Sequence, residues 1–370
     1  MSRVGRLAGL AGERELDQLL VGDLVRPGDS DRTGMANLQY LTGFTGTSGL
    51  CLVGEGVGSG DEPGVFLTDF RYTERAQREI GAEFERTTAE SQLLPALAEH
   101  LAGRVGYDDA NTSVRNLRKL EEVAPDGVEL VPAAGLVEEL RRAKDSDELA
   151  SIAEAQRLTD EVYEWVTGQG LVGRKERDIA LAAEQRMREL GAEGPSFPAI
   201  VAAGENGALP HAEAGEREIG PGELVVIDMG AIVDGYCSDC TRTFATGESD
   251  VEAREVYELV LEAQTAALEA VRAGAGGKVL DAVARELIAA AGHGDEFGHG
   301  LGHGVGIEVH EAPRLGKTSE DELVAGDVVT VEPGVYVRGR FGVRIEDLVS
   351  VEDDGCRILA TYPKELQIVG

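Results

Sequence analysis

Three histidines lie close together in one glycine-rich stretch of the chain. The 370 residues include six histidines, and His299, His303 and His310 fall within HGLGHGVGIEVHE, spaced by four and then seven residues among four glycines. Such a segment could be a metal site, a phosphate-binding loop or a flexible turn. It has neither the G-x-G-x-x-G spacing of a dinucleotide site nor the G-K-[ST] ending of a P-loop. Metal binding and a plain turn remain as the alternatives.

Two carboxylates lie on a predicted hairpin upstream of these histidines. In VVIDMGAIVDGYCSDCTRT, the Asp234-Gly235 pair is a strong signal for a two-residue β-turn. A hairpin closed there places Asp228 opposite Thr241 and puts Asp239, two residues earlier, on the same face. Two like charges so close repel and raise each other's pKa unless a cation holds them. The hairpin therefore favours a metal ion.

A second predicted hairpin repeats the arrangement. Glu332 ends an apolar strand in DVVTVEPGVYV, and Glu346 returns in VRIEDLVSV after a turn around RGRFG. The alternation of a strand puts Arg344 and Glu346 on one face. Carboxylates again occupy positions where apolar side chains would be easier to bury.

Each candidate also has an ordinary structural explanation when it is taken alone. Asp239 could pair with Arg242, Glu346 could pair with Arg344, and His303 could be a hydrogen-bonded core histidine. Four acids on two apolar hairpins, with a histidine-rich segment between them, are hard to explain together in that way. The combination favours a metal site.

The elements that position these residues predict a mixed α/β chain. The segments NLQYLTGFTGTSGLCLVG and GVFLTDFRYTERAQREIG are typical of strands, the second leading into a helix. A long helix is predicted after Asp145 or Ser146, either of which can cap it, and further helices over 175–190, 251–272 and 279–291. Helices followed by an acidic hairpin occur once before residue 250 and once after it. Chain length and the change of pattern near Lys144 predict two domains, 1–143 and 144–370.

The charge balance excludes several kinds of partner. Asp and Glu number 68 against 35 Lys and Arg, for a formal charge of −33. Such a surface repels nucleic acid and anionic membranes, whose phosphates need basic residues. The chain has no run of ~18 apolar residues and no signal-peptide core, which predicts a cytoplasmic protein. Four scattered cysteines make no disulfide framework. The acidity and the excess of Arg over Lys resemble proteins of haloarchaea, which predicts a halophilic protein; a solubilising surface with no special habitat is the alternative.

Ordered motifs run along nearly the whole chain: YLTGFTGTSG, LTDFRYTERA, ELRRAKDSDEL, DMGAIVDGYCSDCTRTF, GHGLGHGVGIEVHEAP, VEPGVY and GVRIED. In this order they resemble the pita-bread metallopeptidases, family M24, in particular Xaa-Pro aminopeptidases and prolidases (Xaa-Pro dipeptidases). The first two are similar to the family's N-terminal domain, the third to the domain junction and the others to the catalytic domain. The resemblance implies a creatinase-like α/β N-terminal domain followed by a pita-bread catalytic domain with pseudo-two-fold halves.

The resemblance also implies which residues bind metal. Five positions match the family's ligands of two divalent ions: Asp228, Asp239, His303, Glu332 and Glu346. Asp239 and Glu346 would bridge the ions, Asp228 would hold one, and His303 with Glu332 would hold the other. Two such ions present a bridging hydroxide to a peptide carbonyl. The oxygen-rich ligand set suits Mn²⁺ or Co²⁺, ahead of Zn²⁺ or Fe²⁺.

Further positions resemble the family's substrate-side residues. Glu332 is similar to the proton shuttle, and His310 to the histidine that steadies the substrate carbonyl and the tetrahedral intermediate. His211, in NGALPHA, resembles the second substrate-side histidine. His299 resembles a pocket histidine near the leaving group. Arg344 resembles a residue that supports the ligands or binds a substrate carboxylate.

The implied activity is that of a dimetal exopeptidase that removes an N-terminal residue preceding proline. The peptide substrate would have proline in second position, and the family often forms homodimers. Dipeptidase and aminopeptidase remain alternatives. A same-fold hydrolase or lyase acting on a small compatible solute, and an aminopeptidase with non-proline specificity, also remain open.

Overall fold

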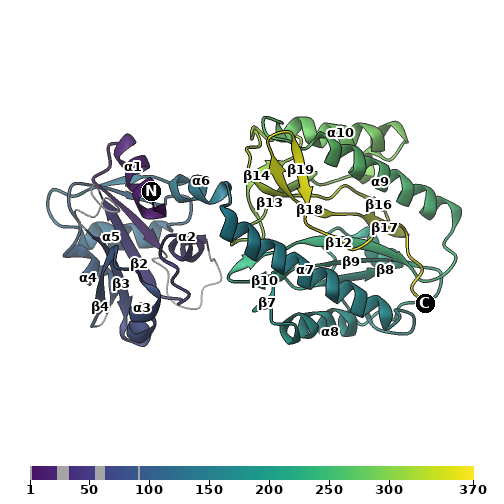
Figure 1. Ribbon diagram of the computed structural model, residues 1–370, viewed down its shortest axis with the longest axis horizontal. Helices are drawn as coiled ribbons and strands as arrows, with labels where there is room; N and C mark the ends of the chain where they lie inside the picture. The colour runs from purple at the N-terminus through teal and green to yellow at the C-terminus, as the bar shows by residue number, and fades with distance from the viewer. Residues whose placement is uncertain (1, 23–32, 55–62, 91) are drawn as a thin grey trace. The chain divides into compact units, whose positions relative to one another are not determined.

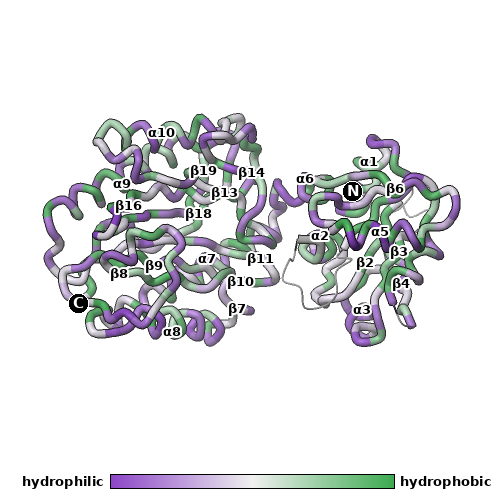
Figure 2. The backbone as a smooth tube through the Cα atoms, turned by 180° about the vertical axis from the view of Figure 1, so that it is seen from behind, coloured by the Kyte–Doolittle hydropathy of each residue, from purple (hydrophilic) through white to green (hydrophobic). Residues whose placement is uncertain are grey.

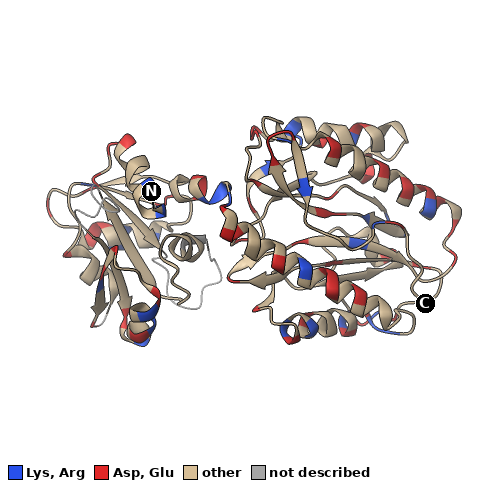
Figure 3. Ribbon diagram, in the orientation of Figure 1, with Lys and Arg blue, Asp and Glu red and all other residues tan. Residues whose placement is uncertain are grey.

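The computed structural model describes residues 2–22, 33–54, 63–90 and 92–370. The chain divides into two compact units, Met1–Arg141 and Arg142–Gly370. None of the helices formed by the described residues is both long and apolar enough to cross a membrane. Figure 3 shows acidic residues, in red, on many of the helices, in keeping with the large negative charge of the sequence.

The N-terminal unit is a mixed sheet of six strands in the order β4-β3-β2-β1-β5-β6, flanked by helices (Figure 1). Its strands are β1 Gln18–Gly22, β2 Gly49–Gly54, β3 Gly64–Asp69, β4 Phe84–Ala89, β5 Arg104–Tyr107 and β6 Glu129–Pro132. Its helices are α1 Arg3–Glu13, α2 Thr33–Thr42, α3 Thr73–Glu79, α4 Leu93–Ala98, α5 Val114–Val123 and α6 Leu136–Arg142. None of the nine candidate site residues lies in this unit.

One predicted strand region of this unit is wrong. Residues 37–42, at the start of NLQYLTGFTGTSGLCLVG, belong to helix α2, and only β2 at the end of that segment is a strand. Asn37, Leu38, Tyr40 and Leu41 are all buried, and this spacing places them on one face of a helix. The short apolar run was therefore compatible with both helix and strand, and packing decided for the helix.

The C-terminal unit has two halves, each with two helices covering strands. The first contains α7 Ser146–Gly168, α8 Glu176–Glu189, β7 Gly194–Pro195, β8 Ile200–Ala203, β9 Leu224–Met229, β10 Ala231–Val233, β11 Tyr236–Cys237 and β12 Cys240–Ala245. The second contains α9 Val251–Ala270, α10 Gly277–Ala290, β13 Gly302–Gly304, β14 Glu311–Leu315, β15 Val328–Val331, β16 Gly334–Val337, β17 Phe341–Arg344, β18 Asp347–Glu352 and β19 Gly355–Ile358. Figure 1 shows the strands of this unit between the α7–α8 pair and the α9–α10 pair.

Each helix pair packs on its own hydrophobic core. Residues of α7 and α8 form one buried cluster with β8, β9 and β12, and residues of α9 and α10 form another with β15 to β18. Figure 2 shows hydrophilic and hydrophobic residues alternating along α8 and α10, as expected for helices with one face buried. Strands β9, β12, β15, β16 and β17 are buried on both faces, and polar side chains there need partners.

Local signals explain how the first half begins and turns. Helix α7 has Asp145 as its N-cap, and the side chain of Glu148 completes a capping box. The predicted turn at Asp234 and Gly235 joins β10 to β11, and both residues have the positive φ that a two-residue hairpin turn requires, +49° and +78°. This turn sets the register of the strands that follow.

Candidate active site

Asp228 lies one residue before the end of the buried strand β9. The structure pairs it with Thr241 of β12, as the sequence predicted. Its Oδ2 accepts a hydrogen bond from Arg344 Nη2 at 2.6 Å, whereas its Oδ1 is buried without a hydrogen-bond partner. Burial raises the pKa of Asp228, against the opposing effect of Arg344. One carboxylate oxygen is therefore available for a cation.

Asp239 and Glu346 approach each other from the two halves of the unit. Asp239 lies between β11 and β12, and Glu346 lies between β17 and β18. Glu346 Oε2 accepts a hydrogen bond from Thr241 Oγ1 at 2.7 Å. Burial, followed by the negative charge of Glu346, raises the pKa of Asp239 well above its usual value. Burial, followed by the charge of Glu332, does the same to the pKa of Glu346.

His303, on the short strand β13, faces these carboxylates. Its Nε2 lies 3.3 Å from Glu332 Oε1 and 3.6 Å from Asp239 Oδ2. Its Nδ1 lies 3.1 Å from the carbonyl oxygen of Gly304, so Nδ1–H donates there. In the neutral ring, the lone pair of Nε2 is then free for a metal. Burial raises the pKa of Glu332, but the hydrogen bond and charge of His303, together with the charges of His299 and Arg344, lower it to about 2.

These residues fit divalent metal ions. Ligand atoms of Asp239, His303 and Glu346 all lie within 4.8 Å of one another, and all three residues are buried. Buried carboxylates that repel one another need positive charge nearby, which explains the raised pKa values. Carboxylate oxygens with one imidazole nitrogen form a ligand set common to Mn²⁺, Co²⁺ and Zn²⁺ sites.

A hydrogen-bonded chain leads from the carboxylates to His299. Arg344 Nη1 donates to Tyr336 Oη at 3.0 Å, and Tyr336 Oη lies 2.9 Å from His299 Nε2. His299 Nδ1 is 2.7 Å from the Gly300 carbonyl, so Nδ1–H donates there and Nε2 accepts from the tyrosine. Arg344 is buried, and its Nε donates to Thr241 Oγ1 at 2.9 Å. The guanidinium is therefore engaged with the groups that hold the carboxylates.

The two remaining candidate histidines, His211 and His310, are exposed at the cavity. The ring of His310 packs edge-on against that of His303, with 4.3 Å between ring centroids. Partial burial of the ring, followed by the charge of His303, lowers the pKa of His310 to about 4, so the ring is neutral near pH 7. His211 lies in the segment before β9 and is exposed. Both can therefore reach a bound substrate.

One cavity of about 1510 Å³ brings all nine predicted residues together: His211, Asp228, Asp239, His299, His303, His310, Glu332, Arg344 and Glu346 line it. Its outer walls include Leu181 of α8 and Arg314 of β14. Tyr336, Thr241 and Arg314 were not predicted to be site residues. Tyr336 ends the motif VEPGVY, and Arg314 follows His310 by four residues, but neither position shows its contacts without the fold.

Comparison with known protein families identifies the family of this chain. The profile of metallopeptidase family M24 matches residues 150–353, and that of the creatinase/prolidase N-terminal domain matches residues 3–143. The chain belongs to metallopeptidase family M24. The predicted fold is thereby confirmed, with a creatinase-like α/β N-terminal domain and a pita-bread catalytic domain.

Relatives of this M24 peptidase cover almost its whole length. An uncharacterized peptidase of Bacillus subtilis is 38% identical over 99% of this chain and 100% of its own, and the Xaa-Pro dipeptidase of Pyrococcus furiosus is 35% identical over 98% and 99%. The solved structure of the Xaa-Pro dipeptidase from Bacillus anthracis is 34% identical and superposes with a TM-score of 0.91, covering 99% of both chains. This M24 protein is a metallo-exopeptidase, a hydrolase that depends on metal.

Proposed function

We propose that this M24 peptidase hydrolyses the bond between an N-terminal residue and a following proline, using two divalent metal ions. The observation that carries the proposal is the convergence of three buried carboxylates, the half-buried Glu332 and His303 on one cavity. The names of its relatives support the substrate, since both an Xaa-Pro dipeptidase and an X-Pro aminopeptidase are among them. An Xaa-Pro bond has no N–H, so it calls for a dedicated pocket.

The five ligands divide between the two ions. We propose that Asp239 and Glu346 bridge the ions, that Asp228 holds one, and that His303 and Glu332 hold the other. Four carboxylates then balance the four positive charges. When bound, the ions lower the pKa of a water and polarise the substrate carbonyl. Mn²⁺ or Co²⁺ is proposed as the metal, because only one of the five ligands is nitrogen.

Glu332 is proposed to move the proton. With a pKa of about 2 it is ionised near neutral pH, so it can accept a proton from the attacking water. Thr330 Oγ1 donates to its Oε1 at 3.1 Å and holds the carboxylate in place. The same carboxyl group can then give the proton to the leaving proline nitrogen, which must gain one as the bond breaks.

The histidines are proposed to hold the substrate. His310, neutral near pH 7, can donate a hydrogen bond to the oxygen of the carbonyl under attack, where negative charge develops. His211 and His299 line the same cavity and are proposed to contact the substrate on either side of it. Arg344 is proposed to support the ligands, because its guanidinium is buried against Asp228, Thr241 and Tyr336.

Arg314 is better placed than Arg344 to meet a substrate carboxylate. It lines the cavity and is exposed, and the structure gives its guanidinium no side-chain partner among the described residues. We propose that it faces the free carboxylate of a short substrate.

We further propose that the protein is cytoplasmic, homodimeric and halophilic, and that its domain boundary lies at 143/144.

Hydrolysis of Xaa-Pro and Xaa-Ala peptides of two lengths, with Mn²⁺ or Co²⁺ in high salt, tests the function. We expect metal-dependent cleavage of Xaa-Pro peptides and little cleavage of Xaa-Ala peptides. Asp239→Ala and Glu346→Ala are each expected to abolish the activity. Failure of the metal-loaded protein to cleave any Xaa-Pro peptide would reject the proposed specificity, and full activity of either variant would reject the bridging pair.

A further inference from the structure

Side chains on both faces of strand β12 contact Glu346. Thr241 and Arg242 are consecutive in that strand, so their side chains leave on opposite faces. Thr241 contacts the carboxylate of Glu346, while Arg242 Nη1 donates to the backbone carbonyl of Glu346. Arg242 is only 1% exposed. Its guanidinium therefore fixes the main chain from which the carboxylate of Glu346 extends.

The join between β12 and the segment that carries Glu346 is narrow. Among the described residues, one backbone hydrogen bond crosses it, from Glu346 N to Thr241 O at 3.1 Å. Asp239 lies on one side of the join and Glu346 on the other, so their separation depends on side-chain contacts across it. Thr243 Oγ1 supplies two such contacts, to the carbonyl and the amide of Arg344 at 2.9 and 3.1 Å. Arg242 supplies two more next to Glu346, to its carbonyl and to Asp347 Oδ1, the latter at 2.9 Å.

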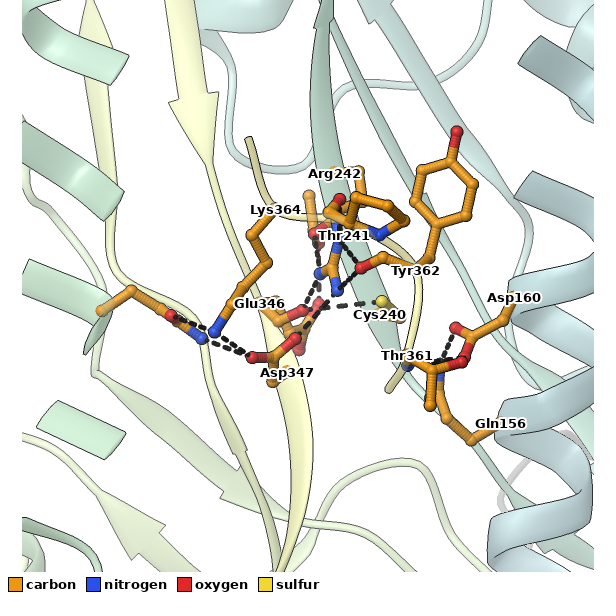
Figure 4. Close-up of polar contacts among 12 residues, drawn as sticks. Gln156, Asp160, Cys240, Thr241, Arg242, Glu346, Asp347, Thr361, Tyr362 and Lys364 are labelled. Atoms are coloured by element: carbon orange, nitrogen blue, oxygen red, sulfur yellow. Dashed lines mark hydrogen bonds and ion pairs between the residues drawn. The ribbon is translucent and has the colours of Figure 1, made fainter. Parts of the chain in front are cut away.

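The last residues of the chain hold Arg242 in turn. Residues 361–369 are called the C-terminal strap below. The Tyr362 carbonyl accepts from Arg242 Nη2 at 2.8 Å and from Nε at 3.2 Å, and the Pro363 carbonyl accepts from Nε at 3.1 Å. Figure 4 shows the guanidinium between the strap and the segment that carries Glu346 and Asp347. Without the strap, these guanidinium N–H groups would lose their acceptors.

Lys364 of the C-terminal strap contacts Asp347, the carboxylate that Arg242 also contacts. Its Nζ lies 2.7 Å from Asp347 Oδ2 and 3.1 Å from Gln264 Oε1, and its backbone carbonyl accepts from Tyr257 Oη at 2.6 Å. Asp347 is 1% exposed and so receives two cations in a buried place, Arg242 and Lys364. The side chain of Lys364 is 24% exposed, so its replacement does not open the core.

Both ends of the strap are fastened to the first half of the unit. At its start, Thr361 N and Oγ1 donate to Asp160 Oδ2 of α7 at 2.6 and 2.7 Å (Figure 4). Near its end, Ile368 forms a parallel β-bridge with Ala245, the last residue of β12. The strap therefore follows β12 and cannot move independently of it.

We propose that Arg242 and the C-terminal strap are positioning elements that set the spacing of Asp239 and Glu346, and through it the affinity for metal. They touch neither substrate nor metal. The inference rests on the proposed function, in which these two carboxylates bridge a pair of ions. A bridging pair must hold its geometry to within about 0.5 Å, and the narrow join alone does not provide that.

Metal binding to the full-length Lys364→Met variant tests the proposal, measured by calorimetric titration of the metal-free protein with Mn²⁺. Loss of a positive charge near a cation site would by itself tighten metal binding. Loss of positioning would weaken it, so the two effects have opposite signs. We expect binding weakened about tenfold, with most of the affinity restored in Lys364→Arg. The matched control is Lys278→Met, which removes an exposed lysine of α10 and should leave the affinity unchanged.

A second variant, Arg242→Lys, keeps the charge and removes the forked set of donors. We expect weaker Mn²⁺ binding and an altered visible spectrum of the Co²⁺-loaded protein, which reports the metal's coordination directly. If this variant does not fold, Lys364→Met decides. Unchanged or tighter Mn²⁺ binding in Lys364→Met, even with a lower thermal midpoint, would show that the strap acts on stability alone. A native protein that binds no Mn²⁺ or Co²⁺ would instead overturn the proposed function itself, and the inference with it.

Discussion

Lys144 and Glu311 form a buried ion pair directly behind His310. Lys144 Nζ lies 2.7 Å from Glu311 Oε1, and their side chains are 1% and 8% exposed. A Cβ on Gly306 would come within 2.3 Å of the same oxygen, so the carboxylate is closely packed and has no room to turn toward water. Lys144→Met keeps the length of the side chain and leaves this carboxylate without its cation. Breaking a buried pair in this way costs about 3–5 kcal/mol, and we expect about 3 kcal/mol because Glu311 keeps other contacts.

Urea unfolding followed by tryptophan fluorescence measures this loss. Trp165 is the single tryptophan of the chain and lies in α7, so the signal reports the C-terminal unit. The free energy of unfolding of Lys144→Met should fall by about 3 kcal/mol with an unchanged dependence on urea. The double variant Lys144→Met/Glu311→Gln should recover more than half of that loss, because no uncompensated charge is left buried.

An exposed ion pair of similar length is the control. Lys175 Nζ lies 2.8 Å from Glu216 Oε2, with side chains 46% and 61% exposed. Because water already solvates both groups, Lys175→Met should unfold at the same urea concentration as the native protein. Equal losses in Lys144→Met and Lys175→Met would refute the role of burial. A double variant no more stable than Lys144→Met would refute the uncompensated charge as the cause.

Three further outcomes are expected. Removal of metal with EDTA should lower the thermal midpoint by about 5–10 °C relative to protein at 100 times the metal Kd, where binding contributes about 2.7 kcal/mol; an unchanged midpoint in calorimetry would contradict this. Tyr336→Phe removes the hydroxyl between Arg344 and His299, so kcat should fall about 10–100-fold. A native kcat would show that the hydrogen bonds from Arg344 through Tyr336 to His299 do not contribute to catalysis. Cys356 is half-buried and the other three cysteines are buried with pKa values raised by burial; one thiol at most should react with Ellman's reagent before unfolding, and fast reaction of several would show that the interior opens.

Local signals in the sequence predicted much of the frame around the site. Asp145 begins α7, and the Asp234-Gly235 turn places Asp228 opposite Thr241, because capping and turn chemistry depend on neighbouring residues alone. The same logic failed for residues 37–42, where a short apolar run fits both helix and strand. The packing of Tyr40 and its neighbours into the core decided for a helix, and packing is not a local property.

The contacts that support the site could not be predicted in the same way. Tyr336 joins Arg344 to His299, and Lys144 meets Glu311 across 167 positions of the chain. Each of these side chains has an ordinary sequence environment. The contacts join residues that are distant in the sequence and become visible only in the folded unit, so no spacing rule could have found them.

The strands of the C-terminal unit are interrupted at several of the candidate ligands. Asp239 separates β11 from β12, Glu332 separates β15 from β16, and Glu346 separates β17 from β18. His303 lies at a shift in register between β13 and β14, and Asp228 lies one residue from the end of β9. In a regular strand, buried on both faces, an acid would have to point into an apolar layer. At a break the backbone turns, and the acid can face the polar cavity while apolar neighbours on both sides stay in the core. An acid inside an apolar run of a sequence therefore predicts the place where a strand stops.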